Sequence, residues 1–366
     1  MKRFLSFFRR VDWFILGPII VLLCFSLAEI YSISLGQAGA DLLFFRKQVA
    51  FVIAGLILYG VLAMIDYHHI YSYYNYLYVA SIIVLVAVLI FGETINGTRG
   101  WFYIGGFGIQ PVELAKVVLL VCLARYFSKS ALASHPIKHL LVSGAGTLVL
   151  VLLVLLQPDF GSAALLFAAW LVIVIAAGLE RRYFIAIAAV LIVILGIAWQ
   201  FVFKDYQRQR ILTFVRPSAS STQYNVRQAI IAVGAGGLYG RGLGFGSQSQ
   251  LKFLPESNTD FIFAVIAEEL GFIGVIMVIG CFAVMFFRIV TLLPHVRNYF
   301  GALFLVGGVG LIFIEMFINI GMNMGILPVV GIPLPFVSSG GSALLAHMAL
   351  AGIMQSVVSR SALKSS

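Results

Sequence analysis

An aspartate stands at the junction between a polar loop and a long apolar run, in the stretch from Gln248 to Gly271. This residue, Asp260, follows a loop with basic residues and a proline turn at Pro255. A carboxylate at such a boundary can accept a proton from a hydroxyl group and so act as a general base. A structural alternative is a capping box, because Ser257 and Asp260 have its spacing and would bind free backbone N–H groups at a helix start. The residues alone leave both interpretations open.

A second set of charged residues lies within apolar runs, where an ionisable group costs at least ~2.5 kcal/mol. Glu113 and Lys116 follow Pro111, and their spacing places them on one face of a helix. They are either an ion pair that neutralises itself so that the helix can insert, or a charged wall of a polar cavity that opens outward. His347 is interpreted as a hydrogen-bonded core group and not as a metal ligand, since no HExxH motif or paired histidine accompanies it. Further acids of this class, expected to be network partners, are Glu268, Glu269 and Glu315.

A glycine-rich stretch covers residues 234–246. It does not fit a nucleotide-binding motif, because its glycines lack the G-x-G-x-x-G spacing and no G-K-[ST] is present. It is either a flexible turn or a segment whose backbone approaches a ligand closely, with Arg241 and Lys252 nearby to bind phosphate. The cysteines lie within apolar runs and have no metal-ligand spacing. No metal site is identified from the sequence.

The composition predicts that the chain is a membrane protein, since 61% of its residues are hydrophobic, only 10% are charged, and the mean hydropathy is +1.05. Apolar runs of about 20 residues, each enough to cross a ~30 Å hydrocarbon core, account for most of the chain. We therefore expect an all-α, polytopic integral membrane protein in which residues 1–366 form a single domain. The ten transmembrane helices are expected at 13–33, 48–65, 76–91, 111–127, 139–156, 162–179, 183–203, 260–287, 299–320 and 341–358.

The net charge of +10 is distributed among loops and does not form one basic stripe, which argues against nucleic-acid binding. With a cytoplasmic N-terminus, the inner ends and loops collect most Lys and Arg residues, so the positive-inside rule places both termini in the cytoplasm. The large loop between the seventh and eighth helices, about 204–258, then lies outside. It carries further basic residues against that bias. We expect this loop to bind an anionic group.

Several motifs together resemble the SEDS family of bacterial cell-wall polymerases, and they span nearly the whole chain. The DYQRQR at 205–210 and the Val-Val-Gly at 329–331 favour its elongation branch, RodA, over its division branch, FtsW. The length and order of the motifs make the resemblance specific. The matching segments are Gln110-Pro111 with Glu113 and Lys116, QPDFG at 157–161, DYQRQR, the glycine-rich stretch, GSQSQLKFLPESNTDFIFAVIAEELG at 246–271 and NIGMNMGILPVVGIPLPFVSSGGS at 319–342.

By this resemblance the chain polymerises lipid II into glycan strands at the outer face of the bacterial inner membrane, with inversion at the donor sugar and undecaprenyl pyrophosphate as leaving group. Asp260 matches the family's essential aspartate and is expected to be catalytic. The resemblance also implies a class B penicillin-binding protein as partner, and a divalent cation could assist the leaving group. Residues expected to bind substrate or line the cavity are Glu113, Lys116, Arg99, Arg208, Arg210, Arg216, Arg241, Lys252, Glu256, Thr259, Ser338 and Ser339.

The match departs from the family pattern in a few places. Arg99 is separated from the following tryptophan by a glycine, so carrying the family's arginine over to it assumes a shift of one residue. Val112, Asn258 and Ser339 stand where serine, histidine and tyrosine are usual. Two other functions stay open: a lipid II transporter, because the Gly- and Pro-rich late segment at 321–341 is typical of broken transporter helices, and a scaffold for a transpeptidase.

Overall fold

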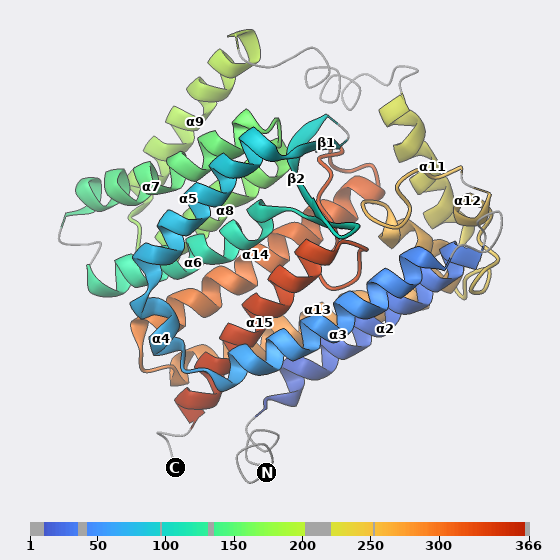
Figure 1. The fold of residues 1–366 in the computed structure, drawn as a ribbon, viewed down its shortest axis with the longest axis horizontal. Coiled ribbons are helices and arrows are strands. Elements are labelled where there is room, and N and C mark those ends of the chain that lie inside the picture. The colour runs from blue at the N-terminus through green and yellow to red at the C-terminus, as the bar shows by residue number, and fades with distance from the viewer. Residues whose placement is uncertain are drawn as a thin grey trace.

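The structure is a computed structural model, which describes residues 11–35, 42–95, 97–130, 135–201, 221–251 and 253–362. It is mostly helical, and the start of the first helix and the end of the last lie at the same end of the molecule (Figure 1). The helices are α2 Trp13–Leu35, α3 Leu43–Met64, α4 Tyr67–Ser72, α5 Tyr74–Phe91, α6 Pro111–Lys129, α7 Pro136–Leu156, α8 Phe160–Ala176, α9 Arg181–Phe201, α11 Ser221–Ala235, α12 Ser247–Gln250, α13 Ile262–Leu292, α14 Tyr299–Asn323 and α15 Gly341–Ala362, with a 3-10 turn η1 Leu293–His295.

Within the described residues, 7 helices are long and apolar enough to cross a membrane. They are α2, α3, α5, α7, α13 with η1, α14 and α15, and α8 is a shorter apolar helix. The prediction of a helical, polytopic membrane protein is confirmed at this level. The expected range 111–127 and the described part of 183–203 also lie in helices, α6 and α9. Pro111 and Pro136 stand in the first turns of α6 and α7, where a missing N–H costs little.

The core is built around α15, in which 89% of an apolar 18-residue stretch is buried. This helix packs along α3, while α14 packs against α6 and α8, and α2 packs against α13. Small residues allow the α3–α15 approach, because a Cβ at Gly352 would lie 2.8 Å from the Tyr59 carbonyl oxygen and one at Gly55 would lie 2.9 Å from Met348 Cγ. Close helix contacts of this kind hold the polar segments between helices in fixed places.

A small antiparallel sheet connects α5 to α6, so the all-α expectation is wrong for this connection. Its strands are β1 Glu93–Ile95, β2 Thr98–Ile104 and β3 Phe107–Ile109, in the order β1-β2-β3. The β2–β3 turn contains Gly105 and Gly106 with φ values of 60° and 81°. Positive φ at both central residues is typical of the tight hairpin turns that match strand twist. The aromatic run before this Gly-Gly pair was the sequence signal for a strand.

The glycine-rich stretch packs on α13. A Cβ at Gly236 would lie 1.7 Å from the Ala267 carbonyl oxygen, and one at Gly240 would lie 2.2 Å from the Glu269 carbonyl oxygen. α13 itself is interrupted at Gly271, which has φ 67° and ψ −162°. The loop backbone donates hydrogen bonds to the freed carbonyl groups, for example from Gly242 N to Glu269 O at 2.9 Å. The close approach that the sequence suggested for a ligand is made here to a helix.

Candidate functional site

Asp260 lies in a turn directly before α13 and is partly buried. The helix begins at Ile262 with Phe261 as N-cap, and no side chain caps that position from within the turn. The capping-box interpretation of Ser257 and Asp260 is therefore wrong, because both residues precede the N-cap. The Ser257 hydroxyl instead lies 3.5 Å from Asn258 Oδ1. The position of Asp260 needs another explanation.

Two buried asparagines on α14 hold the backbone at Asp260. Asn319 and Asn323 each donate a side-chain hydrogen bond to the Asp260 carbonyl oxygen, at 3.0 and 2.9 Å. Asn323 Oδ1 also accepts the backbone N–H of Ala264, in the first turn of α13, at 3.1 Å. The capping hydrogen bond of α13 is thus supplied by a different helix. α14 fixes both the start of α13 and the peptide that carries Asp260.

The segment that follows α14 braces the same turn from a second side. Ser338 Oγ donates to the Thr259 carbonyl oxygen at 2.6 Å, and Ser339 N donates to the Asn258 carbonyl oxygen at 2.9 Å. Within the turn, Thr259 Oγ1 donates to Glu256 Oε2 at 3.1 Å. Glu256 has a φ of 53°, a conformation that residues other than glycine rarely adopt. Four of the predicted site residues are therefore assembled next to Asp260: Glu256, Thr259, Ser338 and Ser339.

The Asp260 carboxylate faces a glycine in this late segment. A Cβ at Gly331 would lie 3.5 Å from Asp260 Oδ2, and Gly331 has a φ of 73°. On its other side, the late segment approaches α8, since a Cβ at Gly161 would lie 2.8 Å from the Val330 carbonyl oxygen. Gly161 is in the first turn of α8, whose N-cap is Asp159. The late segment thus lies between Asp260 and the start of α8.

A cavity of about 420 Å³ opens beside the turn. Its lining combines apolar surface, such as Phe44 and Leu254, with hydroxyl and amide side chains and the Glu256 carboxylate. Convergent neutral polar groups on an apolar wall are suited to a ligand rich in hydroxyl groups. The hydroxyl and amide side chains are Ser249, Gln250, Ser257, Asn258, Thr259 and Ser339.

The charged residues of α6 lie in the protein interior. Lys116 Nζ is 2.9 Å from Glu113 Oε2 and 2.5 Å from Glu315 Oε1, and His347 Nε2 is 2.5 Å from Glu315 Oε2. The predicted ion pair is confirmed, as is the interpretation of His347 as a hydrogen-bonded core group. Since Glu113 and Lys116 are only 3% and 2% exposed, the cluster joins α6, α14 and α15 from inside. This burial favours the structural interpretation of the pair over an outward-facing wall.

The two described arginines among the predicted substrate ligands make hydrogen bonds to other groups of the protein. Arg99 donates to the carbonyl oxygens of Ile90 and Gly92 at 2.8 and 3.1 Å, and so caps the C-terminal end of α5. Arg241 donates to Ala235 O at 3.3 Å and to Ser247 Oγ at 3.1 Å on an exposed surface. The other predicted cations lie outside the described residues: Arg208, Arg210, Arg216 and Lys252.

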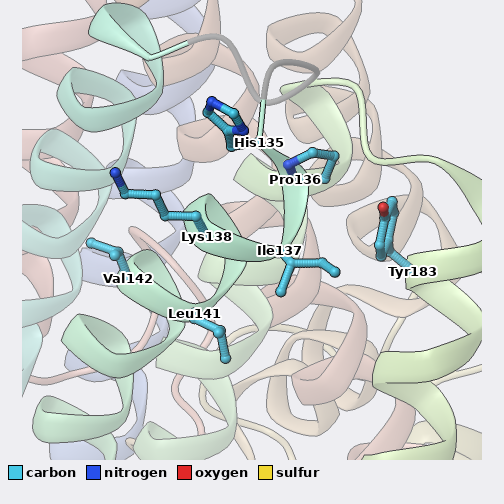
Figure 2. Close-up of a pocket in the computed structure, with 7 residues that line it drawn as sticks. All are labelled: His135, Pro136, Ile137, Lys138, Leu141, Val142 and Tyr183. Atoms are coloured by element: carbon cyan, nitrogen blue, oxygen red, sulfur yellow. The ribbon is translucent and has the colours of Figure 1, made fainter.

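A larger cavity, of about 750 Å³, lies between the starts of α7 and α9. Figure 2 shows His135, Lys138 and Tyr183 around it, and none of the predicted site residues lines it. No group of three His, Cys, Asp or Glu residues in the described ranges is arranged to hold a metal ion. The described residues around Asp260 therefore supply no cluster of three such ligands for a divalent cation.

Asn319 and Asn323 were not predicted as site residues, although both fall within the matching segment at 319–342. Their signal was available, because two amides spaced by four residues share one face of a helix. In an otherwise apolar span, such a pair needs a hydrogen-bond partner in the protein. The partner is the Asp260 carbonyl oxygen.

Comparison with known proteins gives consistent matches over the whole chain. The peptidoglycan glycosyltransferase MrdB of Escherichia coli is 36% identical over 342 residues, which cover 93% of this chain and 91% of that protein. The peptidoglycan glycosyltransferase RodA of Treponema pallidum is 28% identical over 424 residues, covering 95% and 98%. These relatives are similar to this chain over more than nine tenths of its length.

Solved structures agree with these sequence matches. A chain from a structure described as "Structural coordination of polymerization and crosslinking by a peptidoglycan synthase complex" superposes with a TM-score of 0.82 at 28% identity, covering 96% of this chain and 98% of that one. The rod shape determining protein RodA of Thermus thermophilus superposes with a TM-score of 0.69 at 28% identity, covering 96% and 97%. The family model FTSW_RODA_SPOVE, described as cell cycle protein, matches residues 7–362. The chain therefore belongs to the FtsW, RodA and SpoVE family, as its SEDS motifs indicated.

Proposed function

We infer that this chain is a peptidoglycan glycosyltransferase of the elongation type, and that it polymerises lipid II into glycan strands. The names of its relatives MrdB and RodA support the activity and the elongation role. The observation that carries the site is the convergence at Asp260 of the turn before α13, the asparagines of α14 and the loop at Gly331. An aspartate whose backbone is held by side chains of another helix has the fixed position that a general base requires.

In the proposed reaction, Asp260 accepts the proton of the acceptor sugar's 4-hydroxyl group. The hydroxyl oxygen attacks the anomeric carbon of the lipid-linked donor, and the bond to undecaprenyl pyrophosphate breaks. Attack from the opposite side inverts the α-linked donor to a β-glycosidic bond. Positive charge develops on the donor sugar, as in glycoside hydrolysis. The hydroxyl and amide side chains of the cavity beside Thr259 are suited to the sugar hydroxyl groups.

The pyrophosphate leaving group needs positive charge. The proposed cations are Arg241 and the basic residues at 208, 210, 216 and 252, because guanidinium and ammonium groups bind phosphate oxygens strongly. Arg241 is exposed within the glycine-rich stretch, which supports its assignment. Glu113 and Lys116 support the site through the packing of α6 on α14 and do not contact the substrate in this proposal.

We propose ten transmembrane helices in a single domain, with both termini in the cytoplasm of a bacterial cell and the loop at about 204–258 outside its inner membrane. The helices at all ten expected ranges support this arrangement. The start of α2 and the end of α15 lie at the same end of the molecule, as two cytoplasmic termini require (Figure 1). The proposed outer end contains Asp260, where lipid II would be polymerised.

A class B penicillin-binding protein is the proposed partner. Support comes from the similar structure of a peptidoglycan synthase complex, which is described as coordinating polymerization and crosslinking. A transporter of lipid II or a scaffold for a transpeptidase is the alternative function. A transporter moves lipid II across vesicles without forming glycan, and a scaffold tolerates the loss of Asp260. Detergent-solubilised protein separates these functions from polymerisation, since it has no bilayer to transport across.

The test is polymerisation of purified lipid II by the full chain in detergent, with glycan length read on gels. We expect long strands from the unchanged protein and a rate lower by about 10²- to 10⁴-fold for Asp260→Asn and Asp260→Ala. Glu180→Gln is the matched control, because Glu180 is an exposed acid before α9 and does not line the cavity at the catalytic turn. Wild-type rates from a folded Asp260 variant would rule out this residue as the base.

A further inference from the structure

A cavity of about 580 Å³ lies at the far end of α3 from the catalytic turn. Phe44 at the start of α3 lines the cavity beside Asp260, whereas Asp66, just past the end of α3, lines this one. α3 has 22 residues, and at ~1.5 Å per residue a helix of this length spans about 33 Å. That is close to the ~30 Å thickness of a hydrocarbon core. The cavity therefore opens at the opposite membrane boundary, separate from the proposed glycosyltransferase site.

Three chain segments form this cavity, and hydrogen bonds hold them together. Arg360 Nη2 from α15 donates to the Met64 carbonyl oxygen at the end of α3, at 2.7 Å. Asn298 Nδ2, before α14, lies 3.4 Å from the Tyr67 hydroxyl oxygen. The remaining lining comes from the same segments: Asp66 and His68, Arg297 and Tyr299, and Ser361.

Asp66, the acidic residue of the cavity, is paired with other residues that line the cavity. Asp66 Oδ1 accepts the backbone N–H of His68 at 2.9 Å and lies 2.7 Å from His68 Nδ1, while Oδ2 lies 3.5 Å from Arg360 Nε. Partial burial opposes ionisation, but these hydrogen bonds and the Arg360 charge hold the pKa of Asp66 below its usual value. Asp66 is thus ionised and neutralised by Arg360.

Arg297 adds a positive charge that Asp66 does not neutralise, because Asp66 already pairs with Arg360. Its side chain is exposed and makes no hydrogen bond or ion pair with the described part of the chain. A guanidinium group offers a planar set of donors that matches phosphate oxygens, and its charge is permanent. Tyr67 and Tyr299 both belong to the cavity lining, and tyrosines are typical of the membrane–water boundary. The cavity combines a net positive charge with an interfacial position.

We propose that this cavity binds a phosphate-bearing anion, with Arg297 as the cation that contacts the phosphate oxygens. A phospholipid headgroup and inorganic phosphate present the same chemistry to a guanidinium group. The boundary position favours the headgroup, since an anionic leaflet concentrates such groups next to basic side chains. The volume of about 580 Å³ lies within the usual range of small-ligand sites, roughly 300 to 1,000 Å³.

The test measures thermal unfolding of the purified full chain in nanodiscs that contain either phosphatidylcholine alone or added phosphatidylglycerol. A second arm adds inorganic phosphate to the detergent-solubilised protein, with chloride at equal ionic strength as reference. Arg297→Gln removes the cation without breaking a described contact. Arg181→Gln is the control, because Arg181 is also an exposed arginine at a helix start but does not line this cavity.

We expect phosphatidylglycerol to raise the unfolding midpoint of the unchanged protein and of the Arg181 variant. In Arg297→Gln, the apparent affinity for the lipid falls about tenfold or more, as the loss of a charge-assisted hydrogen bond implies. A shift with inorganic phosphate that also depends on Arg297 supports the site and identifies free phosphate as a ligand. Equal responses of the Arg297 and Arg181 variants in both arms overturn the proposal, as does the absence of any shift in the unchanged protein.

Discussion

Replacing the α14 asparagines tests whether they position Asp260. Asn323→Ala removes the cap of α13, worth about 0.5 to 2 kcal/mol, and one donor to the Asp260 carbonyl oxygen. With a buried Ala264 N–H left unpaired, the total loss of unfolding free energy is about 2 to 4 kcal/mol. Asn319→Ala leaves Asn323 bound to the same carbonyl oxygen but removes the hydrogen bond to the Ile332 carbonyl oxygen, so it costs about 1 to 3 kcal/mol.

The two asparagines share an acceptor, so their effects are not additive. When both are replaced, the Asp260 carbonyl oxygen loses both side-chain donors. The double variant therefore loses about 0.5 to 3 kcal/mol more unfolding free energy than the two single variants lose together. Misplacement of a catalytic group by about 1 Å costs roughly 100-fold in rate, so we expect kcat to fall about 10- to 100-fold while KM changes little. The assays are lipid II polymerisation at varied substrate concentration and thermal unfolding of the same preparations.

Asn298→Ala is the matched control for this experiment. Asn298 caps the opposite end of α14, where its side chain accepts the backbone N–H of Phe300 at 3.0 Å. Its loss lowers stability by about 1 kcal/mol without touching the catalytic turn. If Asn323→Ala loses stability but keeps its kcat, or if Asn298→Ala lowers kcat as much, the asparagines stabilise the fold and do not position the base.

Other substitutions test the surroundings of the site. Gly331→Ala places a methyl group 3.5 Å from Asp260 Oδ2, at a residue with a φ of 73°. Gly178→Ala is its control, because Gly178 has a φ of 97° and no atom within 4 Å of its Cβ position. Glycan synthesis per folded protein should fall more in Gly331→Ala than in Gly178→Ala. Lys116→Met removes the lysine that pairs with buried Glu113 and leaves Glu315 with only His347, and the unfolding midpoint should drop by an amount equivalent to about 3 to 5 kcal/mol. Glu29→Leu should raise the midpoint, because both buried oxygens of Glu29 lack a hydrogen-bond partner in the described chain; an unchanged or lower midpoint contradicts this.

The helices of the fold could be predicted because membrane insertion depends on local composition. A run of about 20 apolar residues is enough to specify a span, and a helix lies over each expected range, including the charged α6. The strand pairing between α5 and α6 was not predicted, because a short polar-aromatic connection lacks the long apolar run that specifies a span. Its hairpin depends on Gly105 and Gly106 and on pairing across the turn, such as Phe107 with Ile104.

The candidate site was predictable in its residues and less so in their roles. Motif positions placed Asp260, Thr259, Ser338 and Ser339 in one expected site, and their contacts join the same turn. Spacing alone suggested a capping box for Asp260, because pattern rules consider only neighbours along the chain. The actual cap, Asn323, is 59 residues from the N–H that it binds. Contacts over such separations depend on helix packing and leave no local pattern.

The late segment contains polar groups because a membrane protein must provide hydrogen-bond partners for backbone that is not helical. Non-helical chain at membrane depth is stable only where other parts of the protein satisfy its N–H and C=O groups. The turn before α13 and the loop after α14 are both non-helical, and side chains of α14 and of the loop satisfy part of their backbone. Asn319 Nδ2 binds both Asp260 O and Ile332 O, at 3.0 and 2.8 Å, and Ser338 Oγ binds Thr259 O. The contacts that make this backbone tolerable within a membrane protein are therefore the same contacts that fix the proposed base, so neither segment can hold its geometry without the other.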